Sequence, residues 1–248
     1  MRAGLCLLRL SAVTALAIGA AAVANPAESS KGCDYAMIVL DGSGSMDANS
    51  HPKMAYARQA LHEVVPEIAA ERSLGLIVYG DPDDGRKAGG ELCFAKIALK
   101  VRPQAGAAEP ILKAVDAVSP QGMTPLTEAV ENATHAASDG SPPGTIVLVT
   151  DGLENCSGRP CDLGRRLRAT RPGLAVHIIG LQFPVGSDTP LGCLAAETGG
   201  TIQQVDDALS LAKALRDTLG CPAISDARPL ASPKRELAEI WRNAYPNG

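Results

Sequence analysis

Short oxygen-bearing side chains gather in three separate stretches of the sequence. The first is Asp41-Gly42-Ser43-Gly44-Ser45, the second is Gly122–Leu126 with Thr124 inside it, and the third is Thr150-Asp151-Gly152. Carboxylate and hydroxyl oxygens with no neighbouring His or Cys are ligands for hard cations, so we expect Mg²⁺, with Mn²⁺ or Ca²⁺ also suitable. Five such oxygens, some acting through water, leave one position of an octahedral shell open to a carboxylate from outside.

The elements that would position these stretches alternate between strands and helices. Continuous apolar runs predict strands of a parallel sheet that is covered on both faces, at Tyr35–Leu40, Leu74–Tyr79, Thr145–Val149 and Leu174–Ile179. Ala95–Val101 alternates in polarity, which is typical of an edge strand, and Thr201–Val205 supplies a last short strand. The first and third oxygen-bearing stretches directly follow strands, and ligands of open α/β sheets bind at that edge.

Helical periodicity fills the segments between the strands. We predict helices at Pro52–Val65, Pro110–Val118, Pro125–Ala137, Asp162–Arg168, Leu191–Thr198 and Ala208–Leu219. Pro66 is expected to end or kink the first of them, because a proline inside a helix removes a hydrogen bond. The fold class is therefore α/β: a doubly wound, mostly parallel, Rossmann-like sheet with helices on both faces and one antiparallel edge strand.

The order Asp41-x-Ser43-x-Ser45, then Thr124, then Asp151 resembles the metal-ion-dependent adhesion site of von Willebrand factor type A (vWA) domains. All five positions of that motif are filled, and the resemblance covers about residues 33–221 and is closest to bacterial exported members. It implies that Ser43, Ser45 and Thr124 bind the metal directly, while Asp41 and Asp151 act mainly through water. It also implies that an Asp or Glu of a partner protein completes the shell.

The N-terminus and the C-terminus differ in composition from the domain between them. Residues 1–24 read as a signal peptide cleaved after Ala24, with a retained membrane anchor as the alternative. Residues 25–32 form a short linker, 33–221 the vWA domain, and 222–248 a Pro-containing tail with a short helix. We therefore expect a periplasmic or secreted protein without a stable membrane span in its mature form.

Six cysteines remain after residues 1–24 are removed, and an even count in an exported chain favours disulfides. Cys156–Cys161 is predicted from proximity in sequence, and Cys33–Cys221 because the two residues bracket the periodic sequence. Cys93–Cys193 follows by elimination. The terminal pair is also similar to the disulfide that closes some vWA domains. A zinc site is the alternative, but a second cysteine pair or a nearby His is missing.

The sequence favours a binding module over an enzyme. The net charge of −4 argues against a nucleic-acid partner, and there is neither a Walker A sequence nor a Gly-x-Ser-x-Gly nucleophile motif. We expect an exported, divalent-metal-dependent protein-interaction module. Two alternatives stay open: a metal-assisted, phosphatase-like hydrolase, and a structural or assembly accessory whose metal only stabilises it.

Overall fold

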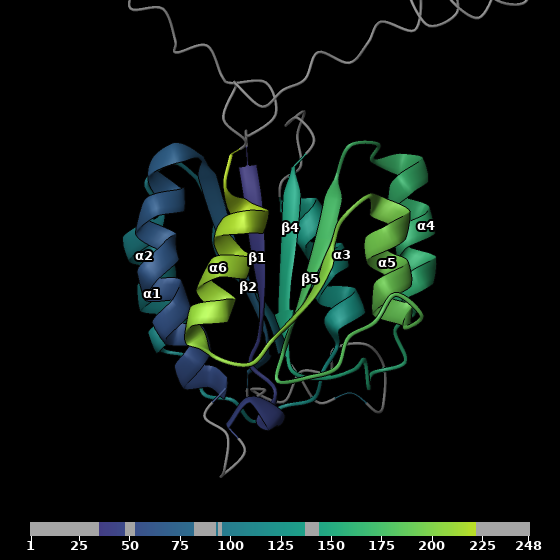
Figure 1. Ribbon diagram of the computed structural model, residues 1–248, viewed down its shortest axis with the longest axis horizontal. Coiled ribbons are helices and arrows are strands. Elements are labelled where there is room, and N and C mark those ends of the chain that lie inside the picture. The colour runs from purple at the N-terminus through teal and green to yellow at the C-terminus, as the bar shows by residue number, and fades with distance from the viewer. Residues whose placement is uncertain (1–34, 48–52, 82–92, 94–95, 137–143, 222–248) are drawn as a thin grey trace, which may run out of the picture.

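A computed structural model describes residues 35–47, 53–81, 93, 96–136 and 144–221 (Figure 1). Six strands form one sheet in the order β3-β2-β1-β4-β5-β6. Their bounds are β1 Tyr35–Asp41, β2 Ser73–Asp81, β3 Lys96–Gln104, β4 Thr145–Thr150, β5 Ala175–Leu181 and β6 Ile202–Val205. All neighbouring pairs are parallel except β2–β3, which is antiparallel. The predicted fold class, including the antiparallel edge strand, is confirmed.

Helices cover both faces of this sheet. They are α1 Lys53–Glu71, α2 Ala108–Asp116, α3 Leu126–Ala136, α4 Pro160–Thr170, α5 Pro190–Thr198 and α6 Ala208–Leu219, with a short 3₁₀ turn, η1, at Gly44–Asp47. One apolar core lies between the sheet and α1, α2 and α6, and a second lies between the sheet and α3, α4 and α5 (Figure 1). Strand β1 is buried along its whole length. Its side chains pack alternately into the two cores, because successive side chains of a strand point to opposite faces.

Of the two effects expected of Pro66, an end or a kink, the end is not observed, because helix α1 continues to Glu71. A proline inside a helix costs about 3 kcal/mol. Ile68 and Ala69, which follow it, are buried in the core, and fully burying one large aliphatic side chain is worth about 1.5–3 kcal/mol. Burial of the last turn of α1 therefore offsets the missing hydrogen bond.

The disulfides differ from two of the predicted pairings. Cys93 bonds Cys156, and Cys161 bonds Cys193, so the predictions of Cys156–Cys161 and Cys93–Cys193 are wrong. Cys156 and Cys161 are close in sequence but lie in different elements, because α4 begins at Pro160. The helical geometry carries Cys161 to α5, which packs closely on α4, while Cys156 stays in the preceding loop.

The predictions for the two ends of the chain concern residues outside the described ranges. The signal peptide at 1–24, the linker at 25–32 and the tail at 222–248 all lie there, and so does Cys33 of the predicted Cys33–Cys221 pair. Cys221 itself is disulfide-bonded. Among the described helices, none is long and apolar enough to cross a membrane.

Candidate metal site

The candidate site lies at the carboxyl edge of the two central strands. Asp41 is the last residue of β1, and Thr150 is the last residue of the neighbouring parallel strand β4. Parallel strands end at the same edge of a sheet, so the loops that leave β1 and β4 meet there (Figure 1). The first loop runs through η1 into α1, and the second carries Asp151.

The loop after β1 is held in a tight turn by backbone contacts. The Ser43 N–H donates to Oδ1 of Asp41 at 2.8 Å, and the Gly42 N–H donates to the Tyr79 carbonyl oxygen at 2.7 Å. Gly80 lies directly against this turn with φ of 77°, and a Cβ atom there would come within 2.4 Å of the Ser43 nitrogen. Only glycine fits that position, and the turn is thereby pressed against the end of β2.

Three of the five predicted residues form a continuous chain of hydrogen bonds. The hydroxyls of Ser43 and Ser45 lie 3.1 Å apart, and the Ser45 hydroxyl donates to Oδ1 of Asp151 at 2.7 Å. Ser43 and Asp151 are buried, whereas Ser45 is exposed. The site therefore has a buried floor and an open side that solvent or a partner can reach.

Asp41 lies at the bottom of the site and is completely buried. Its Oδ2 accepts a hydrogen bond of 2.7 Å from the Thr150 hydroxyl, which in turn accepts one of 3.1 Å from the Tyr79 hydroxyl. Burial raises the pKa of the Asp41 carboxyl, hydrogen bonds from Ser43 and Thr150 oppose this, and the charge of Asp151 raises the pKa further. Two carboxylates close together in a buried place favour a bound cation.

Thr124 joins the site through the backbone. Gly122 pairs with Ser43 as an isolated parallel bridge, and its carbonyl accepts from the Gly44 N–H at 3.0 Å. Thr124 is buried, and its N–H donates to Oδ1 of Asn155 at 2.7 Å. The second loop is thus fastened on one side to the loop after β1 and on the other to the loop after β4.

A cationic side chain already contacts the site. Lys53, the first residue of α1, places Nζ 2.6 Å from Oδ2 of Asp151. The Asp151 side chain is fully buried in this ion pair, and the Lys53 side chain is 15% exposed. Asp151 therefore binds a hydroxyl with one oxygen and a cation with the other.

The residues present fit a hard divalent cation. In the described part of the chain, no group of three or more His, Cys, Asp or Glu side chains forms a metal site, so a cation here depends on hydroxyl oxygens together with two carboxylates. That donor set is chemically suited to Mg²⁺, Mn²⁺ or Ca²⁺. The ammonium of Lys53, held by Asp151, shows that this corner attracts positive charge.

The structure brings the five predicted positions to one sheet edge and adds three residues that sequence reasoning did not assign. Thr150 supports Asp41, Asn155 supports Thr124, and Lys53 neutralises Asp151. The register offered a signal for Thr150: Leu40 pairs with Val149, so the next residues along the two strands, Asp41 and Thr150, are neighbours. Lys53 had no such signal, because it lies on helix α1 and strand register does not place a helix residue beside Asp151.

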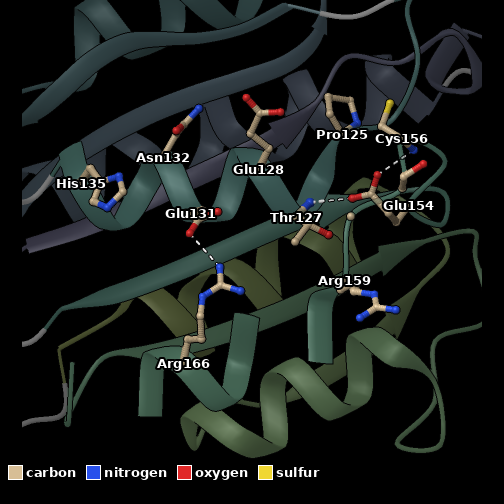
Figure 2. Close-up of a pocket in the computed structure, with 12 residues that line it drawn as sticks. Pro125, Thr127, Glu128, Glu131, Asn132, His135, Glu154, Cys156, Arg159 and Arg166 are labelled. Carbon is tan, nitrogen blue, oxygen red and sulfur yellow. Dashed lines mark hydrogen bonds and ion pairs between the residues drawn. The ribbon is translucent and has the colours of Figure 1, made fainter. Parts of the chain in front are cut away.

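A pocket of about 580 Å³ adjoins the site, between α3, the loop after β4 and α4 (Figure 2). On its wall, Glu154 accepts from the Thr127 N–H at 2.8 Å and from the Cys156 N–H at 2.7 Å. Glu154 thereby caps the start of α3 and orders the loop that follows Asp151. Burial raises the pKa of Glu128 on the same wall, and the neighbouring carboxylates of Glu131 and Glu154 add to the shift.

Residues 36–154 match the family model of the von Willebrand factor type A domain. The matched segment contains all five predicted ligand positions. Among curated proteins, YwmD of Bacillus subtilis, described as uncharacterized, is 25% identical over 169 residues, which is 66% of this chain and 75% of that protein. YwmC of the same organism is 23% identical over 167 residues, 66% and 73% of the two chains.

Solved structures share the fold at low identity. BatB from Bacteroides thetaiotaomicron aligns with a TM-score of 0.55 at 19% identity, covering 75% of this chain and 97% of that one. Proximal thread matrix protein 1 from the mussel byssus, described with a zinc-occupied MIDAS motif, aligns at 0.55 and 18%, covering 76% and 45%. The pilus adhesin SpaC from Lactobacillus rhamnosus GG aligns at 0.55 and 15%, covering 75% and 30%.

Proposed function

For a chain that contains a von Willebrand factor type A domain, we propose a divalent-metal-dependent protein-binding module that takes an acidic side chain of a partner. One observation carries the proposal. Ser43, Ser45 and Asp151 are joined in one hydrogen-bonded chain above the buried carboxylate of Asp41, with Ser45 open to the outside. The mussel protein, described with zinc in its MIDAS motif, supports a divalent metal in this kind of motif.

The chain's own residues have distinct parts in this proposal. Ser43, Ser45 and Thr124 would offer hydroxyl oxygens directly, and Asp41 and Asp151 would hold water and supply negative charge. The Thr150 hydroxyl fixes Oδ2 of Asp41 by a hydrogen bond, and Asn155 holds the Thr124 backbone in place. When bound, Mg²⁺ supplies a Lewis-acidic position that an outside carboxylate can occupy. The protein's contribution is a rigid set of oxygens that leaves that position accessible.

A binding role is proposed over catalysis because of the side chains that surround the oxygens. The described residues that contact Asp41, Ser43, Ser45 and Asp151 are hydroxyls, backbone groups and one lysine. Every described cysteine is disulfide-bonded and therefore not available as a nucleophile. The two disulfides whose partners are both described also support an exported protein, because such bonds persist in oxidising compartments.

Calorimetric titration of the purified protein with Mg²⁺ and with Mn²⁺ tests the metal. We expect saturable binding by the wild type, loss of binding in Asp151→Ala, and unchanged binding in Asp217→Ala, which removes an exposed carboxylate that is paired with Lys213 on α6. Absence of binding to the wild type with either metal would contradict the proposal.

Affinity capture from an envelope extract, run with Mg²⁺ and then with chelator, tests the partner. We expect a protein that is retained with Mg²⁺ and released by chelator, and that is not retained by Ser43→Ala. Capture that survives chelation would instead favour a structural accessory whose metal only stabilises it. Turnover of phosphate esters that requires the metal would favour the hydrolase.

A further inference from the structure

Lys53 stands at the start of α1, where a positive charge is normally unfavourable. The N-terminus of a helix carries a partial positive charge, so cations are favoured in the last turn and anions in the first. Helices α2, α4 and α6 follow this rule, with Lys113, Arg168 and Arg216 in their last turns. In α1 the pattern is reversed, because the first turn contains Lys53 and no acidic residue.

The ion pair with Asp151 accounts for this placement. The two groups lie 2.6 Å apart, and the carboxylate is fully buried beneath the ammonium. A buried carboxylate without a counter-charge is costly, so Lys53 offsets that cost at the expense of an unfavourable interaction with its own helix. Lys53 is thus the counter-charge of Asp151, although the two residues are 98 positions apart in the sequence.

We propose that Lys53 is a built-in competitor for the divalent cation: the ammonium neutralises Asp151 when the metal is absent and must leave Asp151 for the metal to bind. This inference rests on the proposed function. Asp151 contacts Ser45 with Oδ1 and Lys53 with Oδ2, so both of its oxygens are engaged. An ammonium and a divalent ion that share one carboxylate repel each other strongly at such short range.

The side chain of Lys53 has a route away from the site. It is 15% exposed, and its four-carbon stem allows the ammonium to turn into solvent while α1 stays in place. The Asp151 carboxylate would thus have a cationic partner in either condition: the Lys53 ammonium without the metal, or the divalent ion with it. The consequence is a threshold, because the metal binds only at concentrations high enough to displace the lysine.

The test is Mg²⁺ titration by calorimetry at constant ionic strength on the purified wild type, Lys53→Met and Lys53→Gln. Methionine keeps the apolar stem, and glutamine keeps a hydrogen-bond donor without the charge. Lys213→Met is the matched control, because Lys213 also makes a 2.6 Å ion pair, with Asp217, but on the exposed face of α6. We expect both Lys53 variants to bind Mg²⁺ at least about tenfold more tightly than the wild type, equivalent to about 1.4 kcal/mol. The control is expected to match the wild type.

Melting in chelator is the second measurement. We expect Lys53→Met to melt below the wild type in chelator, because Asp151 is left without its counter-charge, and to regain the difference when Mg²⁺ is added. Equal Mg²⁺ affinities for the wild type and both Lys53 variants would overturn this inference while leaving the metal-binding proposal intact. Absence of binding to all of them would overturn the proposed function and this inference together.

Discussion

The two ends of strand β1 both bury charge, but they do so in opposite ways. At its first residue, Tyr35, the guanidinium of Arg72 donates to the Tyr35 carbonyl oxygen and, at 2.8 Å, to the carbonyl oxygen of Leu219 at the end of α6. At its last residue, Asp41, one buried carboxylate lies near a second, Asp151, and the only cation that the described contacts place on this pair is Lys53.

The helix termini sharpen this contrast. The guanidinium of Arg72 packs against the C-terminus of α6, where the helix dipole stabilises a cation, and only 7% of the residue is exposed. Lys53 lies at the N-terminus of α1, where the dipole opposes it. The amino end of β1 is therefore arranged for stability, whereas the carboxyl end buries two carboxylates at a cost in stability, as the proposed metal site requires.

The largest effect on stability is expected from Arg72→Met. Removal of the guanidinium leaves the buried carbonyl oxygens of Tyr35 and Leu219 without this donor, which should cost about 4 kcal/mol. Denaturant unfolding in chelator measures the loss. Arg58→Met is the matched control, because half-buried Arg58 also donates to carbonyl oxygens, those of Val115 and Val118, and its loss should cost about 1 kcal/mol. Equal losses of unfolding free energy in the Arg72 and Arg58 variants would contradict the special contribution of Arg72 to stability at the amino end of β1.

The Cys161–Cys193 bond should give the next largest effect. Its removal in the double variant Cys161→Ala/Cys193→Ala frees a loop with a sequence separation of 32 residues, and we expect a loss of about 3 kcal/mol in the free energy of unfolding. The bond joins α4 to α5, away from the oxygen cluster, so Mg²⁺ affinity should stay the same. A large loss of affinity would show that the carboxyl edge depends on this helix pair.

Asp41→Asn should raise the stability of the metal-free protein, whereas the two preceding variants lower it. The buried carboxylate has a raised pKa, so its charged form destabilises the fold, and this cost disappears as the pH falls through the raised pKa. In chelator at neutral pH, the amide variant should melt a few degrees above the wild type. It should gain nothing from Mg²⁺. A variant that melts below the wild type in chelator would show that Asp41 serves stability.

The smallest effect is expected from His177 on β5. Its Nδ1 accepts from the Thr201 N–H at 3.1 Å, and burial lowers its pKa, so the neutral ring is preferred in the folded state. Stability should therefore rise with pH between the lowered pKa and the ordinary value near 6.5, by less than about 1.4 kcal/mol per pH unit. The slope should shrink in His177→Gln. Unfolding measured from pH 5 to 7 compares the two slopes.

Residue patterns predicted the strands of the sheet well. Burial on both faces leaves unbroken apolar runs in the central strands, and the edge strand alternates in polarity. Helix α6 begins and ends at the predicted residues, Ala208 and Leu219, while α1 runs past Pro66 because tertiary burial outweighs a local rule. The disulfide pairs could not be read from spacing. Helix α4 separates Cys161 from Cys156, although they are only five residues apart.

By itself, the sequence predicted which positions meet at one edge of the sheet, since Asp41, Ser43, Ser45, Thr124 and Asp151 follow strands or precede helices whose order brings them there. Only the tertiary structure decided what surrounds them. Lys53 and Asn155 contact the site across the fold, at sequence separations that no local pattern encodes. The reason is physical: strand periodicity is a local property, whereas the partner of a buried charge is set by which helix start and which loop pack against it.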